Sequence, residues 1–225
     1  MSDGDKDVRC LVIGGGGASG TAALRQLISQ NSSWEVKAYE PRSKAGGVWL
    51  FEGDPEPICF SFDREGRPIA AGKNDAVKMP SAIYNHLHTN LPFPLMSFRD
   101  IQFPSSTPLY PSHEVVTKYL QDACLPVEHC ITYNRKVVRL RHTPKESGYS
   151  RRWLVESRDL LSQQVFEEDF DYIAAANGHF YQPYVPYIRD LWKWAGRLEH
   201  ARAYRLPHSY TGRVSTVQWL YACLV

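Results

Sequence analysis

The sequence has no paired cysteines. Its five cysteines are scattered along the chain, and no two of them have the Cys-x-x-Cys spacing of a zinc site or a redox-active disulfide. The eight histidines show no metal-ligand spacing either. A metal site is therefore not indicated, and a disulfide reductase is disfavoured. Unpaired thiols are typical of a reducing compartment, so we expect a cytoplasmic protein.

The sequence also lacks a strong excess of charge and a long hydrophobic run. A net charge of +2 gives no signal for nucleic-acid binding. The longest apolar run, residues 219–225, is too short to span a bilayer, and the polar N-terminus 1–7 does not resemble a signal peptide. The 225 residues can bury one good core or two small ones. We expect a globular protein whose partners are small molecules, with an oligomeric state that the sequence leaves open.

One segment near the N-terminus has the order strand, glycine turn, helix, strand, acid. The apolar run 10–13 is followed by the glycine cluster 14–20, a helical pattern over 21–28, a strand-like run over 34–39 and then Glu40. Glycines let the backbone turn sharply and approach a pyrophosphate. The helix N-terminus offers free N–H groups to phosphates, and an acid after the second strand can bind both ribose hydroxyls. The segment therefore predicts a dinucleotide site.

The register of the glycine motif is ambiguous in the sequence alone. Gly15, Gly17 and Gly20 have the Gly-x-Gly-x-x-Gly spacing. Starting the motif at Gly14 would place Ser19 at the third position, where a small residue lets helix and strand pack closely. We adopt the first register, and a glycine-rich loop with no ligand is the alternative. The cofactor contacts predicted for this turn are those of Gly15, Gly17, Ala18, Ser19 and Gly20.

The residues after Glu40 indicate which dinucleotide is bound. The segment Gly46-Gly47-Val48-Trp49 resembles the Gly-Gly-x-Trp segment of flavoproteins, which lies near the FAD in the two-dinucleotide-binding fold. An enzyme that uses only a nicotinamide cofactor has no reason to carry it. Taken without its neighbours, the glycine pair is equally well explained as an ordinary turn and Trp49 as a core residue. With the fingerprint beside it, the segment implies FAD contacts at Gly47, Val48 and Trp49.

The middle of the chain has little periodicity. Residues 51–111 are rich in proline, glycine and aromatic residues, which predicts long connecting structure with short helices. Ser112 is expected to cap a helix that runs to about residue 125. The residues expected on the buried face of this helix are Val115, Val116, Tyr119, Leu120 and Ala123.

The pattern after this helix completes an α/β fold. Three strand-like runs, 136–142, 152–157 and 164–169, predict an antiparallel meander. The run 171–176 predicts a buried strand that returns to a parallel sheet. The expected fold is a Rossmann-like FAD-binding domain of the two-dinucleotide-binding type, with a parallel sheet and an antiparallel β-meander.

The most specific resemblance lies in residues 194–205. Gly196, His200 and Tyr204 match the flavin-containing monooxygenase signature Phe-x-Gly-x-x-x-His-x-x-x-Tyr, which an arginine often follows, and Trp194 replaces the phenylalanine. The related Baeyer–Villiger monooxygenases have tryptophan at the position of Tyr204, so that branch is disfavoured. Over about residues 8–213 the chain is identified as a member of the flavin-containing monooxygenase family.

Two further segments are similar to that family. Residues 88–92 resemble its Thr-Asn-x-Pro segment, whose asparagine sits beside the reactive edge of the flavin. The resemblance implies that Asn90 is a catalytic residue, and a turn residue before proline is the alternative. Residues 176–179 resemble the family's Ala-Thr-Gly-His at the end of a returning strand, with Asn177 in place of threonine.

The resemblance implies a reaction carried by cofactors. NADPH would reduce FAD, and the reduced flavin would oxygenate a soft nitrogen or sulfur nucleophile through a C4a-hydroperoxide, while the protein excludes water. Glu40 would hold the adenosine ribose, and Asn90 would hydrogen-bond near the flavin. Gly196, His200 and Tyr204 would shape the join between the FAD and NADPH domains without acting as acid–base catalysts.

The sequence has no second glycine fingerprint for NADPH. We therefore expect a truncated chain, with an incomplete FAD domain over 1–190, a linker over 191–213 and an aberrant tail over 214–225. A non-catalytic FAD-binding fragment or an interaction module is the alternative to an active monooxygenase. A reductase that uses only a nicotinamide cofactor is disfavoured by the flavoprotein segment 46–49 and by the signature.

Overall fold

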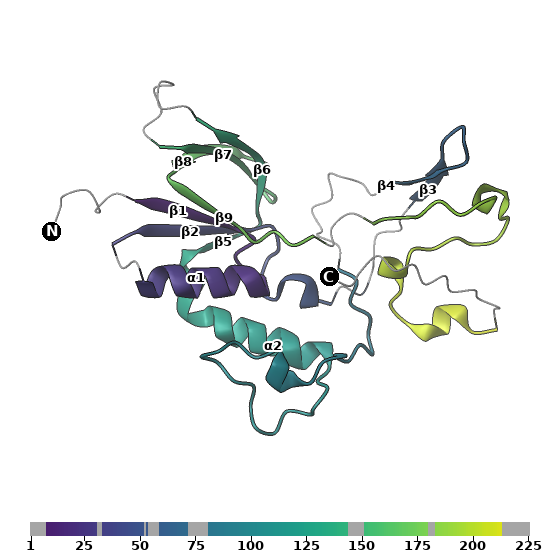
Figure 1. Ribbon diagram of the computed structural model, residues 1–225, viewed down its shortest axis with the longest axis horizontal. Coiled ribbons are helices and arrows are strands. Elements are labelled where there is room, and N and C mark those ends of the chain that lie inside the picture. The colour runs from purple at the N-terminus through teal and green to yellow at the C-terminus, as the bar shows by residue number, and fades with distance from the viewer. Residues whose placement is uncertain are drawn as a thin grey trace.

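The computed structural model describes residues 8–30, 33–51, 53, 59–71, 81–143, 151–179 and 183–212. Its centre is a parallel sheet with the strand order β5-β2-β1-β9 (Figure 1). The strands are β1 (Arg9–Ile13), β2 (Glu35–Glu40), β5 (Ile131–Tyr133) and β9 (Tyr172–Ala175). The predicted first, second and returning strands are present. The expected burial of the returning strand is wrong, because β9 lies at the edge of the sheet and has both of its end residues exposed. The three-residue β5 was not predicted.

Two different layers cover this sheet, the helices α1 (Ala18–Gln30) and α2 (His113–Cys124) on one face and a meander on the other (Figure 1). Successive residues of a strand point to opposite faces. Cys10 and Val12 accordingly pack with Leu24 of α1, whereas Leu11 packs with Phe170 of the meander. Each fully buried aliphatic side chain contributes about 1.5–3 kcal/mol, so both layers stabilise β1.

The antiparallel meander is confirmed. It consists of β6 (Arg135–His142), β7 (Trp153–Asp159) and β8 (Val165–Phe170), paired in that order. The observed strands agree with the predicted runs to within two residues at each end. The α/β fold class with a Rossmann-like parallel sheet and a separate antiparallel sheet is therefore observed.

The predicted second helix is present, but the side chain of Ser112 does not cap it as expected. Ser112 occupies the N-cap position without a side-chain bond to the helix backbone, and its hydroxyl bonds the Glu114 carboxylate instead. The buried face is confirmed at Val116, Tyr119, Leu120 and Ala123, whereas Val115 is half-buried. This face packs on Phe103 in a third apolar cluster.

The middle stretch holds a hairpin that was not predicted, β3 (Cys59–Phe62) and β4 (Pro68–Ala71). Its turn is stabilised by Asp63, whose carboxylate accepts the N–H groups of Glu65 at 3.0 Å and Arg67 at 2.7 Å. The predicted short helical structure is found as a 3₁₀ turn over Phe93–Leu95. Figure 1 shows the hairpin on the far side of the molecule from the helices, beside the segment that leads to the C-terminal part.

The C-terminal described segment, 183–212, contains three short 3₁₀ turns, over Leu191–Lys193, Ala201–Ala203 and Pro207–Tyr210. The expected tail 214–225 lies outside the described residues, and the division into domains stays a prediction. No helix among the described residues is both long and apolar enough to cross a membrane. The cytoplasmic location stays a prediction.

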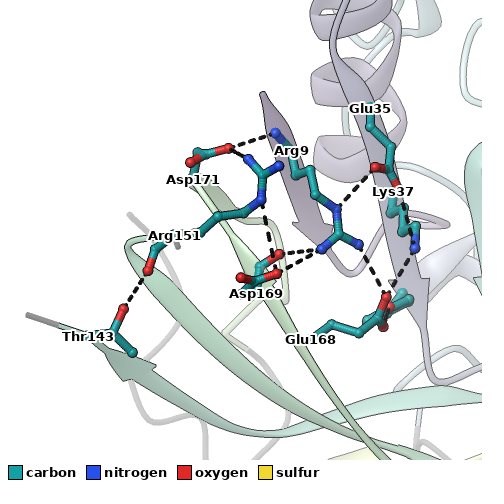
Figure 2. A network of polar contacts seen from close by, with 9 residues as sticks. Arg9, Glu35, Lys37, Thr143, Arg151, Glu168, Asp169 and Asp171 are labelled. Carbon is teal, nitrogen blue, oxygen red and sulfur yellow. Dashed lines mark hydrogen bonds and ion pairs between the residues drawn. The ribbon is translucent and has the colours of Figure 1, made fainter. Parts of the chain in front are cut away.

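Charged residues join the sheet to the meander at the end where β1 begins (Figure 2). Arg9 donates to Glu35 at 3.0 Å and to the Asp169 carboxylate at 3.0 Å. The backbone N–H of Arg9 donates to Asp171 at 2.8 Å, and Asp171 also pairs with Arg151. Because these ions are mutually paired and only partly buried, we interpret the network as structural.

Candidate functional site

The opposite end of the sheet carries the glycine turn. The N–H groups of Gly14 and Gly15 donate to the carbonyl of Tyr39, at 2.8 and 3.4 Å, so the turn begins at the carboxyl ends of β1 and β2. Gly14 has a φ of +84°, and a side chain there would begin 2.6 Å from the carbonyl oxygen of Ala176 after β9. In open α/β sheets the crevice outside these strand ends is where ligands bind.

The structure gives Gly17 and Gly20 different surroundings. A Cβ at Gly20 would lie 2.1 Å from the carbonyl oxygen of Gly14, so Gly20 lets helix α1 pack directly on the strand end. A Cβ at Gly17 would meet only ordinary contacts, at 3.7 Å or more. Gly17 is therefore not required for packing, as expected of a position that leaves room for a ligand.

The first turn of α1 faces outward. Ala18 and Ser19 are exposed, so Gly20 and not Ser19 occupies the close-packed position of the motif. The first N–H groups of a helix have no partner within the helix, and the positive end of its dipole lies there. The turn and helix start thus have the form of a phosphate-binding site.

Glu40 lies beside this turn at the end of β2 and is only 3% exposed. One carboxylate oxygen accepts the N–H of Gly16 at 3.0 Å, and the other accepts the N–H of Arg42 at 3.0 Å. Burial raises the pKa of Glu40, and these hydrogen bonds and the charge of Arg42 oppose that rise. A carboxylate has about four acceptor positions, so the two oxygens can also accept a pair of hydroxyls.

The Gly46–Trp49 segment packs against the same turn. The N–H of Gly46 donates to the carbonyl of Gly16 at 2.8 Å, and a Cβ at Gly47 would begin 2.8 Å from the Cα of Gly17. Both glycines have positive φ, +132° and +54°. Val48 is exposed, whereas Trp49 is half-buried against the apolar cluster of α2. Trp49 therefore has, in part, the core role that was the alternative interpretation.

Asn90 lies at an exposed position of an irregular segment. Its neighbour Thr89 is buried and orders the segment, since its N–H donates to the Pro111 carbonyl at 3.0 Å and its hydroxyl to the Leu91 carbonyl at 2.7 Å. The Asn90 side chain is therefore presented outward by a fixed backbone. Asn177, after β9, is also exposed.

The signature residues lie in the C-terminal described segment, and each has its own contacts. One ring nitrogen of His200 accepts the N–H of Arg202 at 3.1 Å, and the other lies 3.3 Å from the carbonyl of Tyr184. Burial lowers the pKa of His200, so the ring is neutral and donates from Nε2. With both ring nitrogens in contact with the backbone, His200 orders the segment. That it is not an acid–base catalyst stays a prediction.

Gly196 and Tyr204 have structural surroundings as well. A Cβ at Gly196 would begin 2.7 Å from the indole of Trp194, and the glycine is exposed. The ring of Tyr204 packs edge-on against Tyr84, with centroids 5.3 Å apart. Tyr84 precedes the Asn90 segment, so the signature contacts the same part of the chain that carries Asn90.

Sequence reasoning missed Ser81, which is 1% exposed and hydrogen-bonded to both Val48 and Arg205. No local motif marks a single serine in a proline-rich stretch. The described residues contain no group of three or more His, Cys, Asp or Glu that could hold a metal ion. Cys10 is buried within β1 and, like Cys124 and Cys130, is a free thiol.

The geometry described above agrees with comparisons to known proteins. A family model described as "Flavin-binding monooxygenase-like" matches residues 7–219. The chain belongs to this family. It is 30% identical over 218 residues to flavin-containing monooxygenase FMO GS-OX-like 2 of Arabidopsis thaliana, and 31% identical over 219 residues to FMO GS-OX-like 6 of the same plant. The predicted family is therefore confirmed.

Solved structures of flavin monooxygenases share the fold. The S-allyl-L-cysteine S-oxygenase of Allium sativum superposes with a TM-score of 0.73 at 26% identity, over 91% of this chain and 44% of that one. The protein Tmm of Pelagibacter superposes with a TM-score of 0.70 at 21% identity, over the same shares. The two Arabidopsis proteins match over 93% of this chain but 44% and 43% of their own length. The chain thus spans less than half the length of these relatives.

Proposed function

We propose that this chain binds FAD at the glycine turn and contributes the FAD half of a monooxygenase. The observation that carries the proposal is the combination of a glycine turn, an outward-facing helix start and a buried Glu40 with acceptor positions to spare. The pyrophosphate would lie over 15–20, the adenosine ribose on Glu40, and the flavin side of the cofactor towards the Gly47–Trp49 segment. FAD supplies the redox chemistry when bound.

The proposed reaction oxygenates a soft nucleophile. One atom of O₂ is added to a sulfur or nitrogen atom, the other leaves as water, and NADPH and a proton supply the two electrons and two protons. A sulfur substrate is favoured because a relative with 26% identity is named an S-allyl-L-cysteine S-oxygenase, and that compound is a thioether. Residues 191–213 would be the linker to an NADPH-binding domain.

We assign Asn90 to the flavin edge. The support is its outward presentation by the buried Thr89 and its place in the Thr-Asn-x-Pro segment. A side-chain amide can both donate and accept a hydrogen bond, which suits a group that holds a polar ring edge. Replacing Asn90 with Ala should leave FAD affinity within about threefold while lowering turnover by about tenfold or more, the range for loss of one oriented hydrogen bond.

The test is an absorption spectrum of the purified chain after addition and removal of excess FAD. A bound flavin spectrum that survives gel filtration supports the site, and a protein that retains no flavin contradicts it. The same sample is then supplied with NADPH, oxygen and S-allyl-L-cysteine, with free FAD as the control. Sulfoxide formed above the free-FAD rate supports the enzyme.

A second candidate is an FAD-binding chain without turnover. The 225-residue sequence carries a single glycine fingerprint, and the nicotinamide cofactor of the proposed reaction needs its own site. Positioning of the hydride donor against the flavin supplies much of the rate. In this case the chain retains FAD but forms sulfoxide no faster than free FAD does. The comparison between retained flavin and turnover therefore separates the two candidates.

A further inference from the structure

Arg205 follows the signature tyrosine and is 6% exposed. Its guanidinium donates to three backbone carbonyls, those of Ser81 at 2.7 Å, Arg202 at 2.7 Å and Tyr204 at 2.8 Å. Two of these carbonyls belong to the signature segment itself. The third, Ser81, is 124 residues earlier in the chain.

The side chain of Ser81 makes two further hydrogen bonds. Its hydroxyl donates to the carbonyl of Val48 and accepts the N–H of Ile83 at 3.3 Å. The backbone of the same stretch is tied to the signature a second time, since the N–H of Asn85 donates to the carbonyl of Arg205 at 3.1 Å. Ser81 is therefore held by the signature segment through its carbonyl, and it contacts the backbone of Val48 through its hydroxyl.

Val48 lies within the short 3₁₀ turn Gly47–Trp49, which touches the glycine turn. The Cα atoms of Gly47 and Gly17 are neighbours, and Gly46 donates to Gly16. A continuous series of contacts therefore runs from Arg205 through Ser81 and Val48 to the backbone at Gly17. Each contact in it is a hydrogen bond or a close backbone approach.

We propose that Arg205 is a positioning residue that holds the Gly46–Trp49 segment against the glycine turn by way of Ser81. The site thereby depends on whether the signature segment is docked. The inference rests on the proposed FAD site for its functional consequence, but the contacts that would carry the coupling are present without a ligand. Arginine suits the role because its planar fork serves several acceptors at fixed angles, whereas the compact ammonium of lysine cannot span the same carbonyls.

The first experiment measures hydrogen–deuterium exchange of the FAD-free chain. Trp49 and Leu50 donate backbone bonds to Gly46 and Gly47, so their amides report directly on the segment. In Arg205→Lys, exchange over 46–50 should accelerate about tenfold, whereas exchange in β1 and β2 should not change. The matched control is Arg189→Lys, the same substitution in the same C-terminal segment at a side chain that is 90% exposed.

Ser81→Ala provides a second variant that keeps Arg205 and its bond to the Ser81 backbone. It should accelerate exchange over 46–50 to the same extent, and the double variant should be no faster than either single one. A purely structural role for Arg205 would instead raise exchange throughout the chain. Unchanged exchange over 46–50 in both single variants, or effects that multiply in the double variant, would overturn the proposal.

FAD affinity then tests the consequence. If the wild type binds FAD, Arg205→Lys should weaken binding about tenfold in the Ser81 background and less than twofold in the Ser81→Ala background. Equal affinity of wild type and Arg205→Lys would overturn the inference while leaving the FAD site in place. A wild type that binds no FAD would overturn the proposed function, and the exchange data on the FAD-free chain would still decide whether the coupling exists.

Discussion

The two ends of the parallel sheet differ in how their charged groups are arranged. Where β1 begins, Arg9, Arg151 and Lys37 meet Glu35, Glu168, Asp169 and Asp171, and the charges are mutually paired (Figure 2). Where β1 ends, the side chains are absent over Gly14–Gly17, and the carboxylate beside the turn is the buried Glu40.

The difference separates structural from ligand-binding chemistry. At the first end each acidic group already has a cationic partner, so a ligand would have to displace one. At the second end Glu40 accepts the backbone N–H groups of Gly16 and Arg42. Ala18 and Ser19 at the start of α1 are exposed, and the first N–H groups of a helix have no partner within the helix. Substitutions at the first end should therefore change stability without changing cofactor affinity, whereas cofactor affinity should depend on the second end.

The largest expected effect is at Gly20. Gly20→Ala places a methyl group 2.1 Å from a backbone oxygen, so α1 must move away from the strand. The free energy of unfolding should fall by about 3 kcal/mol or more, the upper range for overpacking, and FAD affinity should fall with it. Chemical denaturation and FAD titration measure the two quantities.

Two glycine controls sharpen this prediction. Gly17→Ala meets only ordinary contacts, so it should cost less than about 1 kcal/mol of stability while still weakening FAD binding. Gly53→Ala has no neighbour within 4 Å and should change neither quantity. A Gly20→Ala protein as stable as Gly53→Ala would show that the helix does not pack on the strand end as described.

The next effect is on the affinity for FAD. Glu40→Ala should weaken FAD binding by about 1–3 kcal/mol, the scale of charge-assisted hydrogen bonds to the ribose. Because burial raises the pKa of Glu40, the wild-type affinity should also decline as the pH falls through that raised pKa, above 4.5. Ribose hydroxyls donate to the ionised carboxylate, so protonation removes the acceptor. Equal affinities of wild type and Glu40→Ala at pH 7 would contradict the site.

A substitution at the other end of the sheet, where β1 begins, should change stability alone. Asp171→Asn removes the charge that pairs with Arg151 and accepts the backbone N–H of Arg9. Because the side chain is 28% exposed, the free energy of unfolding should fall by only about 1–2 kcal/mol. FAD affinity should stay within about twofold of wild type, since the two ends of a strand are independent sites. A large loss of affinity would show that the two ends are not separate.

The sequence predicted the local fold of the candidate site well, whereas the binding role of its residues stays a prediction. The turn, α1 and Glu40 lie within 31 residues, Cys10 to Glu40, and their spacing reflects steric needs that the structure displays at Gly20 and Gly47. The hairpin β3–β4 was missed because each of its strands has only four residues, which is too short for a periodic pattern to be detected. The bond from Arg205 to Ser81 spans 124 residues, and no local pattern encodes such a contact.

The smallest effect is a difference in the sign of the pH dependence at the two ends. Burial alone would raise the pKa of Glu168, but hydrogen bonds from Tyr39 and Lys37 and the charge of Arg9 lower it below its ordinary value of 4.5. The stabilisation by ionised Glu168 is therefore present above pH 4.5 and is lost as the pH falls through the lowered pKa. For Glu40 the pKa is raised, so its stabilising contribution is present below pH 4.5 and is lost as the pH rises through the raised pKa.

Glu168→Gln and Glu40→Gln, studied without FAD, expose this opposition. The stability deficit of Glu168→Gln relative to wild type should shrink towards acid, and its size at pH 7 should be within about 1 kcal/mol, as for partly exposed pairs. The stability of Glu40→Gln relative to wild type should decline towards acid, because only the wild type gains from protonation there. Urea denaturation at several pH values, from about pH 3 to about pH 7, measures both slopes because it covers the ranges below and above 4.5. Slopes of the same sign would mean that the pKa values of Glu168 and Glu40 are shifted in the same direction. The proposed difference between the ion-paired end of the sheet and the end with the glycine turn would then be wrong.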